Sequence, residues 1–222
     1  FFPRYHRLCG MSGTLREAGS ELRCIYGLSV SVVPLRQPSR RQTWPTRTYA
    51  SAEAKWKAVV DRVGELHTVG RPILIGTDSV ADSEELARRL ANVGLVAQVL
   101  NARDDGKEAG IVARAGQPRA IMVTTNMAGR GTDIALSAGV AELGGLHVIC
   151  CQRNSARRID RQLQGRCARQ GDPGSTETIV ALDHSSAAHS LAQGIIGLLA
   201  NPGRSTPLAP IVGRILLALP RR

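Results

Sequence analysis

Residue types able to bind phosphate are concentrated near position 165 of this 222-residue chain. Gln162, Gly165, Arg166 and Arg169 follow one another in the order Q-x-x-G-R-x-x-R. A helix is expected over residues 155–169, and helical residues three apart share a face, so both guanidinium groups reach a common target. Guanidinium groups held against a γ-phosphate stabilise the charge that develops during phosphoryl transfer. The pattern predicts Arg166 and Arg169 as catalytic arginine fingers with Gln162 beside them; the alternative is a solvated helix face.

A glycine-bearing turn at residues 126–133 holds a second group of candidates. Its glycines permit backbone conformations that bring main-chain N–H groups close to a ligand. Arg130, Gly131, Thr132 and Asp133 are therefore expected to contact a nucleotide. Asp133 either accepts a hydrogen bond from a ribose hydroxyl or pairs with an arginine across the site. The alternative for Asp133 is a turn former without a ligand.

Two parts of an ATP site are missing from the sequence. It contains no G-x-x-x-x-G-K-[ST] motif, so nothing in it cradles the β- and γ-phosphates as a P-loop does. No apolar run ends in paired acidic residues that would hold Mg²⁺. The arginines thus predict half of a nucleotide site. Glu108, at the start of an expected helix, either interacts with the helix dipole or couples to the arginines across a lobe interface.

Short apolar runs alternate with helical patterns through the middle of the chain. Strands are expected over residues 72–76, 96–100, 120–124, 147–151 and 176–182, and helices over 52–66, 82–93, 107–115 and 155–169. Such alternation predicts an α/β fold, a parallel sheet with helices on both faces. Ligands of these sheets bind beyond the carboxyl ends of the strands, where Thr77 and residues 125–133 follow two strands. Asp82 or Ser83 is expected to cap the second helix.

The two ends of the chain differ from this middle part. Residues 14–26 predict a helix with Thr14 as N-cap and Glu17 completing a capping box, followed by a strand over 28–33. Residues 34–47 carry three prolines and four arginines without periodicity, which indicates a linker. Residues 185–222 are apolar but broken by glycine and proline. We expect a poorly ordered tail or a helix packed on the domain; a membrane- or partner-binding helix over 208–219 is the alternative.

Composition limits the class of protein. A net charge of +11, from 29 Lys+Arg and 18 Asp+Glu, suits contact with phosphates, nucleic acid or an anionic membrane surface, although a coding bias towards arginine has the same result. Adjacent Cys150 and Cys151 are predicted to be buried in a reducing compartment, and no cysteine spacing suits zinc. The sequence shows no signal peptide and no apolar run of roughly 20 residues. It lacks an initiator Met and is expected to be a fragment or the product of a truncated reading frame.

Four segments carry a more specific resemblance: GMSGT, NMAGRGTDI, ELGGLHVI and RRIDRQLQGRCARQGDPGS. They resemble SecA, the ATPase motor family of bacterial protein export, over residues 1–183. The Q-x-x-G-R-x-x-R pattern is shared across helicase superfamily 2 and implies a RecA-like lobe. NMAGRGTDI together with RQGDPGS is more specific to SecA.

The resemblance implies a division of the chain and a set of roles. Residues 1–50 would hold the end of a first nucleotide-binding lobe and a linker, residues 51–184 the second lobe, and residues 185–222 the tail. ATP would lie between the lobes, with Mg²⁺ held by the first. Arg130 and Asp133 would contact the nucleotide, Arg166 and Arg169 would be its arginine fingers, and Glu108 would link ATPase control to the lobe interface. Implied partners are the first lobe, preprotein and the SecYEG channel, in the cytoplasm and at the periphery of the inner membrane.

The sequence also departs from the SecA pattern. Gln164 stands where Arg is common, Cys167 and Ala168 replace Ser and Gly, and the short span from Ile134 to Gly144 resembles accessory SecA forms. The residues leave open a superfamily 2 nucleic-acid helicase lobe or an inactive remnant. The SecA-specific segments argue against the helicase, so nucleic acid is not an expected partner. ATP hydrolysis by this chain alone is not expected.

Overall fold

The structure is a computed structural model that describes residues 4–15, 18–100, 105–125, 133–154 and 157–182, with the backbone alone for 105–109. Its helices are α1 (Gly19–Tyr26), α2 (Ala52–Val69), α3 (Val80–Asn92), α4 (Asp105–Arg114) and α5 (Arg157–Gln164). Its strands are β1 (Arg40–Thr43), β2 (Arg47–Tyr49), β3 (Ile73–Thr77), β4 (Gln98–Leu100), β5 (Ile121–Thr125), β6 (Leu146–Cys150) and β7 (Pro173–Ala181).

All of these strands belong to one parallel sheet, which confirms the predicted α/β class. The strand order is β1-β7-β6-β3-β5-β4, and β2 also pairs with β7. Strand β3 lies between β5 and β6, with Ile75 opposite Val123 on one side and Ile149 on the other. Helices α2, α3, α4 and α5 connect β2 to β3, β3 to β4, β4 to β5 and β6 to β7 across the faces of the sheet, as parallel connections require.

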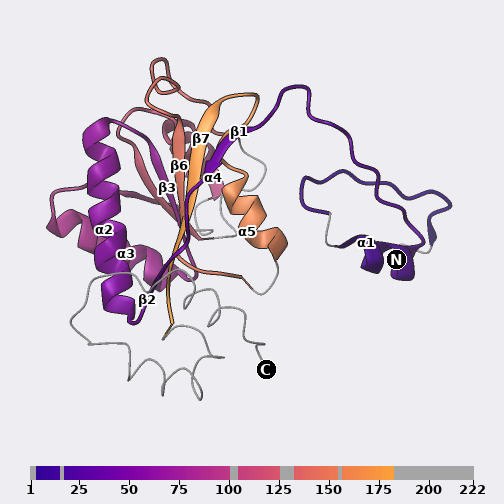
Figure 1. Cartoon of the computed structure of the whole chain (residues 1–222), viewed down its shortest axis with the longest axis horizontal. Coiled ribbons are helices and arrows are strands. Elements are labelled where there is room, and N and C mark those ends of the chain that lie inside the picture. The colour runs from indigo at the N-terminus through magenta and orange to yellow at the C-terminus, as the bar shows by residue number, and fades with distance from the viewer. Residues whose placement is uncertain (1–3, 16–17, 101–104, 126–132, 155–156, 183–222) are drawn as a thin grey trace.

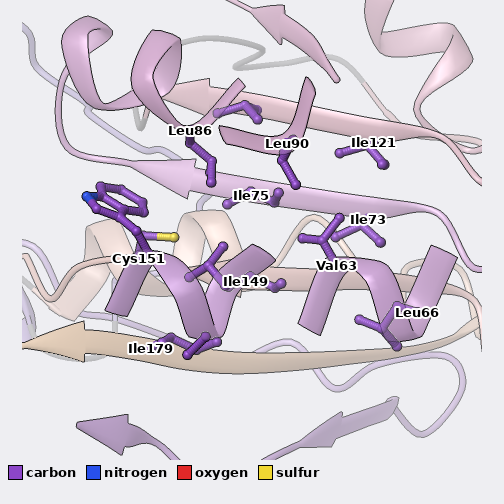
Figure 2. Packing of buried hydrophobic residues seen from close by; sticks show 14 of the residues in the cluster. Val63, Leu66, Ile73, Ile75, Leu86, Leu90, Ile121, Ile149, Cys151 and Ile179 are labelled. Atoms are coloured by element: carbon purple, nitrogen blue, oxygen red, sulfur yellow. The ribbon is translucent and has the colours of Figure 1, made fainter. Parts of the chain in front are cut away.

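Two apolar cores form because alternate residues of each strand point to opposite faces. On one face, Val63 of α2 and Leu86 of α3 pack against Ile73 and Ile75 of β3, as Figure 2 shows. On the other face, α4 and α5 pack against strand residues that include Leu74, Met122 and Val148. The sheet is therefore covered by helices on both sides, with α2 and α3 on one face (Figure 1).

Serine side chains fix the starts of the two longest helices. Ser51 Oγ accepts a hydrogen bond from the backbone N–H of Ala54 at the start of α2. Ser79 Oγ accepts from Asp82 N–H at the start of α3, so the expected caps Asp82 and Ser83 lie inside that helix. A serine oxygen facing the first free N–H groups is the usual N-cap arrangement.

The N-terminal predictions need correction. Helix α1 starts at Gly19 after Ala18, whereas Thr14 lies in a turn, and Glu17 falls outside the described residues. Residues 28–33 form no strand in the described part of the chain, and Val32 and Val33 are exposed. Helix α1 buries none of its residues and lies apart from the sheet (Figure 1). Without a neighbouring strand or core, β-branched residues do not make a strand on their own.

The segment predicted as a linker, residues 34–47, contains strand β1 and the first residue of β2 instead. Residues Arg40–Thr43 of β1 pair with 173–176 of β7, and Arg47–Tyr49 of β2 pair with 179–181. Pro45 separates the two strands, in keeping with the preference of proline for strand edges and breaks. Every side chain of β1 is exposed, so neither alternation nor hydrophobicity marks it in the sequence.

Gly145 provides a test of how closely β6 and β7 approach. Its φ is 69°, and a Cβ at this position would overlap the carbonyl oxygen of Pro173, whereas Gly139, with φ 82°, has open space around it. We expect Gly139→Ala to destabilise the fold by about 1 kcal/mol, the cost of left-handed backbone. Gly145→Ala should cost about 3 kcal/mol or more, because overpacking adds to that cost. Urea denaturation of both variants measures the difference; equal losses would contradict the close approach.

Candidate functional site

The two candidate arginine fingers lie beyond the end of α5, not on it. The helix ends at Gln164, and its last turn tightens as Arg166 N–H donates to Leu163 O at 3.0 Å. The loop that follows has φ near 55° at both Ala168 and Gln170, which no helix allows. The predicted helix over residues 155–169 is therefore too long, and Arg166 and Arg169 do not share a helical face.

Arg169 is held in place by two contacts within the site. Its Nη1 lies 2.7 Å from Asp133 Oδ1, and its Nε–H donates to Gly165 O at 2.8 Å. Pairing of Asp133 with an arginine, one of the two alternatives from the sequence, is thus what the structure contains. The two contacts fix the guanidinium plane of a side chain that is 36% exposed.

A cavity of about 620 Å³ opens beside this pair. Its lining residues come from the segment just before and within β1, from Asp133 and from the loop before β7: Leu35, Arg36, Gln37, Pro38, Ser39, Arg41, Asp133, Ala168, Arg169, Gln170 and Gly171. Arg36, Arg41 and Arg169 place three cationic groups around it against the carboxylate of Asp133. The excess of guanidinium groups suits a polyanion such as a nucleotide phosphate.

The cavity lies near the amino ends of β1 and β7, not beyond the carboxyl ends of the strands. Its residues 168–171 directly precede β7, and Arg40 of β1 is paired with Pro173. Thr77, predicted at a carboxyl end, is fully buried and its Oγ1 lies 2.6 Å from Ser83 Oγ. Thr77 therefore fixes the start of α3 and does not face a ligand.

The structure brings together only some of the predicted site residues. Arg166 and Gln162 are described, but neither lines this cavity. Arg130, Gly131 and Thr132 fall outside the described residues, and Glu108 lies in α4 at a position whose side chain is not described. Sequence reasoning missed Arg36 and Arg41, although the density of arginines in the expected linker was a signal for them.

The three buried cysteines have no sign of reactive chemistry. Burial raises the pKa of Cys150 and of Cys151 to about 12, and their predicted burial is confirmed. Burial also raises the pKa of Cys167, against the opposing charge of Arg41.

Over the ranges that the structure describes, no three His, Cys, Asp or Glu side chains come together as metal ligands, and Asp133 alone does not make a Mg²⁺ site. None of the described helices has the length and apolarity to cross a membrane.

A buried polar chain fixes the amino half of β7 next to the site. Arg71 Nη2 donates to Ser175 Oγ at 2.8 Å, and Ser175 Oγ lies 2.7 Å from His147 Nδ1. His147 Nε2 lies 3.1 Å from Glu177 Oε1. Because Arg71 donates to Ser175, the serine hydroxyl is free to donate to Nδ1, and the imidazole proton then resides on Nε2, facing Glu177.

Two further arginines complete the environment of Glu177. Arg47 of β2 and Arg62 of α2 each reach one of its carboxylate oxygens at 2.9 Å. Burial opposes the ionisation of Glu177, but the hydrogen bond from His147 and the arginine charges outweigh it, so its pKa lies below the usual value. Burial lowers the pKa of His147, and the charges of Arg71 and Arg62 add to this against the effect of Glu177. The network therefore contains a neutral histidine and an ionised glutamate.

Comparison with known proteins places this chain in a family. A family model described as the SecA P-loop domain matches residues 38–142 and 137–190. Protein translocase subunit SecA 2 of Magnetococcus marinus is 50% identical over 198 residues, which are 89% of this chain and 30% of the relative. SecA 2 of Bordetella avium is 54% identical over 183 residues, 82% of this chain and 28% of the relative. The chain thus spans less than a third of the length of these relatives.

A solved structure supports the RecA-like fold. The Escherichia coli DEAD-box protein SrmB, solved in complex with regulator of ribonuclease activity A, superposes with a TM-score of 0.52 at 20% identity. The match covers 75% of this chain and 88% of that one. At this level of identity the likeness concerns the fold alone, and it confirms the predicted RecA-like architecture.

Removal of the Glu177 charge tests the buried network. Glu177→Gln leaves Arg47 and Arg62 without their counter-charge, and we expect a loss of about 3 kcal/mol. This loss is at the lower end of the range for breaking a buried ion pair, because the side chains of Arg47 and Arg62 remain 25% and 23% exposed. Glu85→Gln, which removes a partly exposed partner of both Arg88 and Arg89 on α3, should cost less than about 1 kcal/mol. Urea denaturation at neutral pH compares them, and equal losses would contradict the network.

His147 makes the stability depend on pH. Because its folded pKa lies below the unfolded value of about 6.5, the unfolded chain binds more protons just below that pH, and stability should fall as the pH falls. Glu177 adds a second loss once the pH falls below about 4.3, the unfolded value for Glu. Between about pH 7 and 5, the melting temperature of His147→Gln should change less with pH than that of the wild type, which thermal melts measure. An unchanged slope would show that His147 does not carry the dependence.

Proposed function

This chain belongs to the SecA protein translocase family, and we propose that it forms the second nucleotide-binding lobe of such an ATPase. The observation that carries the proposal is the Asp133–Arg169 pair at the edge of a cavity rich in guanidinium groups. The residues around this cavity are held in place by the parallel sheet of a RecA-like fold. ATP would be bound jointly with a first lobe that carries the P-loop and the Mg²⁺ ligands, since this sequence has no such motif.

Arg169 has the environment expected of a residue that meets a phosphate. One contact to a carboxylate and one to a backbone carbonyl orient its guanidinium without burying it. Fixed orientation matters because catalysis by charge stabilisation depends on donors that need not rearrange during the reaction. Arg166 would act as the second finger, and Gln162, Arg130, Gly131 and Thr132 would contribute contacts to the nucleotide. Glu108 would couple the lobe interface to hydrolysis.

The wider roles follow from the family and are part of the proposal. Nucleotide-driven closure of the lobes would move preprotein through the SecYEG channel, with the protein in the cytoplasm and at the periphery of the inner membrane. We place residues 51–184 in the second lobe and residues 185–222 in a separate tail. Pairing of β1 and β2 with β7 argues for adding residues 40–50 to the same lobe. The SecA relatives favour this function over a nucleic-acid helicase lobe.

A chimeric translocase tests the role of Arg169. In the chimera, this chain replaces the aligned part of the Bordetella avium SecA 2 protein, and the rest of that protein supplies the P-loop lobe. Steady-state ATP hydrolysis by the chimera is then measured. We expect Arg169→Ala to lower kcat at least about 100-fold, as for loss of an arginine finger. Arg169→Lys should lower it nearly as much, because lysine lacks the planar fork. Arg88→Gln, on the exposed surface of α3, serves as the control and should leave kcat unchanged.

The isolated chain provides the complementary measurement. The purified 222 residues should show no Mg²⁺-dependent ATPase activity, because the phosphate cradle is missing. Robust turnover that is lost on Arg166→Ala would contradict the division of the site between two lobes. Salt-sensitive RNA binding at physiological ionic strength, with no effect of Arg169 on the chimera, would favour the helicase alternative.

A further inference from the structure

The loop that carries Arg169 has a backbone that is unfavourable by itself. Residues 165–172 connect α5 to β7, and within them Ala168 and Gln170 have φ of 55° although neither is glycine. Gly171 follows with φ 88°. Left-handed conformations at non-glycine positions persist where surrounding contacts hold them, and here two of them flank Arg169. The origin of those contacts therefore decides what positions Arg169.

The segment just before and within β1 makes such contacts. Arg41 Nη2 donates to Cys167 O at 3.1 Å, and Arg40 Nη1 lies 3.5 Å from Gly171 O. Gln37 packs so closely over Gly171 that a Cβ there would overlap its Oε1. The loop is thus contacted at both of its ends, before and after Arg169, by residues 37–41.

The contact from Arg41 acts on a buried residue of the loop. Cys167 is 1% exposed, and the carbonyl oxygens of Gln164 and Ser175 lie 3.4 and 3.5 Å from its Sγ, where they share its single S–H donor. Its own carbonyl group accepts the hydrogen bond from Arg41, two residues before Arg169. A guanidinium donor makes a stronger bond to such a carbonyl than a neutral donor does.

We propose that Arg41 is a positioning residue for Arg169, and that residues 37–41 couple the N-terminal part of the chain to the orientation of this arginine. The catalytic meaning of the coupling rests on the proposed function. Strand β1 is an edge strand of four residues, and the chain before it lies apart from the sheet (Figure 1). A displacement of that region relative to the sheet reaches the Arg169 loop first through Arg41 and Gln37.

Hydrogen exchange in the purified 222-residue chain tests the positioning without any nucleotide. The Nε–H of Arg169, which donates to Gly165 O, and the amide of Asp172, which donates to Arg169 O, report on the loop. In Arg41→Gln we expect their protection to fall about tenfold, the loss of one charge-assisted hydrogen bond. Amides of β3 and β5 should keep their protection, which shows that the sheet remains folded.

Arg36→Gln is the matched control for this measurement. It removes the same charge from the same cavity, but the loop contacts described above come from Gln37, Arg40 and Arg41. Its exchange rates should stay within about twofold of wild type, the size of an exposed charge effect. If Arg41→Gln leaves the loop protected, or if Arg36→Gln exposes it equally, Arg41 does not position the loop and the inference is wrong.

The chimeric translocase supplies the catalytic test. Arg41→Gln should lower kcat for ATP hydrolysis about tenfold with KM within about twofold, and should add nothing in an Arg169→Lys background, since both changes act through one group. Additive losses would overturn the inference, because they indicate a separate, structural effect. If the wild-type chimera is inactive, or if its kcat does not change on substitution of Arg169, the result counts against the proposed function instead. In either case the hydrogen-exchange measurement still decides whether Arg41 positions the loop.

Discussion

Parallel pairing around β7 is the constraint on which the rest of the structure depends. A parallel strand cannot be joined to its neighbour by a tight turn, so its partners come from distant parts of the sequence. On one side β7 pairs with β6, and on the other with β1 and β2, which lie more than a hundred residues earlier. The same strand therefore joins residues 40–49 to the rest of the sheet and sets where the loop that carries Arg169 ends.

The buried charges around Glu177 depend on that pairing. A carboxylate that is nearly inaccessible to water is costly unless it is fully paired, and here Arg47, Arg62 and His147 supply the pairing from β2, α2 and β6. Each partner belongs to a different element, so the carboxylate is satisfied when all of them are docked in register. The network thus favours one register of β2 against β7 over a shifted one, in which Arg47 would lose its counter-charge.

The parts of the fold that could be predicted are those whose signal is local. Strands β3, β5 and β6 are apolar runs buried on both faces, and α2 has apolar residues at helical spacing, so their residue types alone indicate them. Strand β1 is polar and exposed, and it exists because β7 is beside it. The same limit applies to the site. The pairing of Asp133 with an arginine is among the alternatives that the sequence predicts. The position of this pair near the amino ends of β1 and β7 depends on the loop that carries Arg169, and the left-handed residues of that loop carry no sequence signal.

The Asp133–Arg169 pair also bears on how half of a nucleotide site remains stable without its ligand. Three guanidinium groups around one cavity repel one another, and Asp133 reduces that repulsion. With side chains 36% and 54% exposed, the pair belongs to the class of ion pairs that contribute at most about 1 kcal/mol. A phosphate group, with more charge and more acceptor oxygens than a carboxylate, competes well against so weak a contact. The hydrogen bond from Arg169 Nε–H to Gly165 O does not involve Asp133. If a phosphate group replaces the Asp133 carboxylate as the partner of Arg169, this hydrogen bond still orients the guanidinium group.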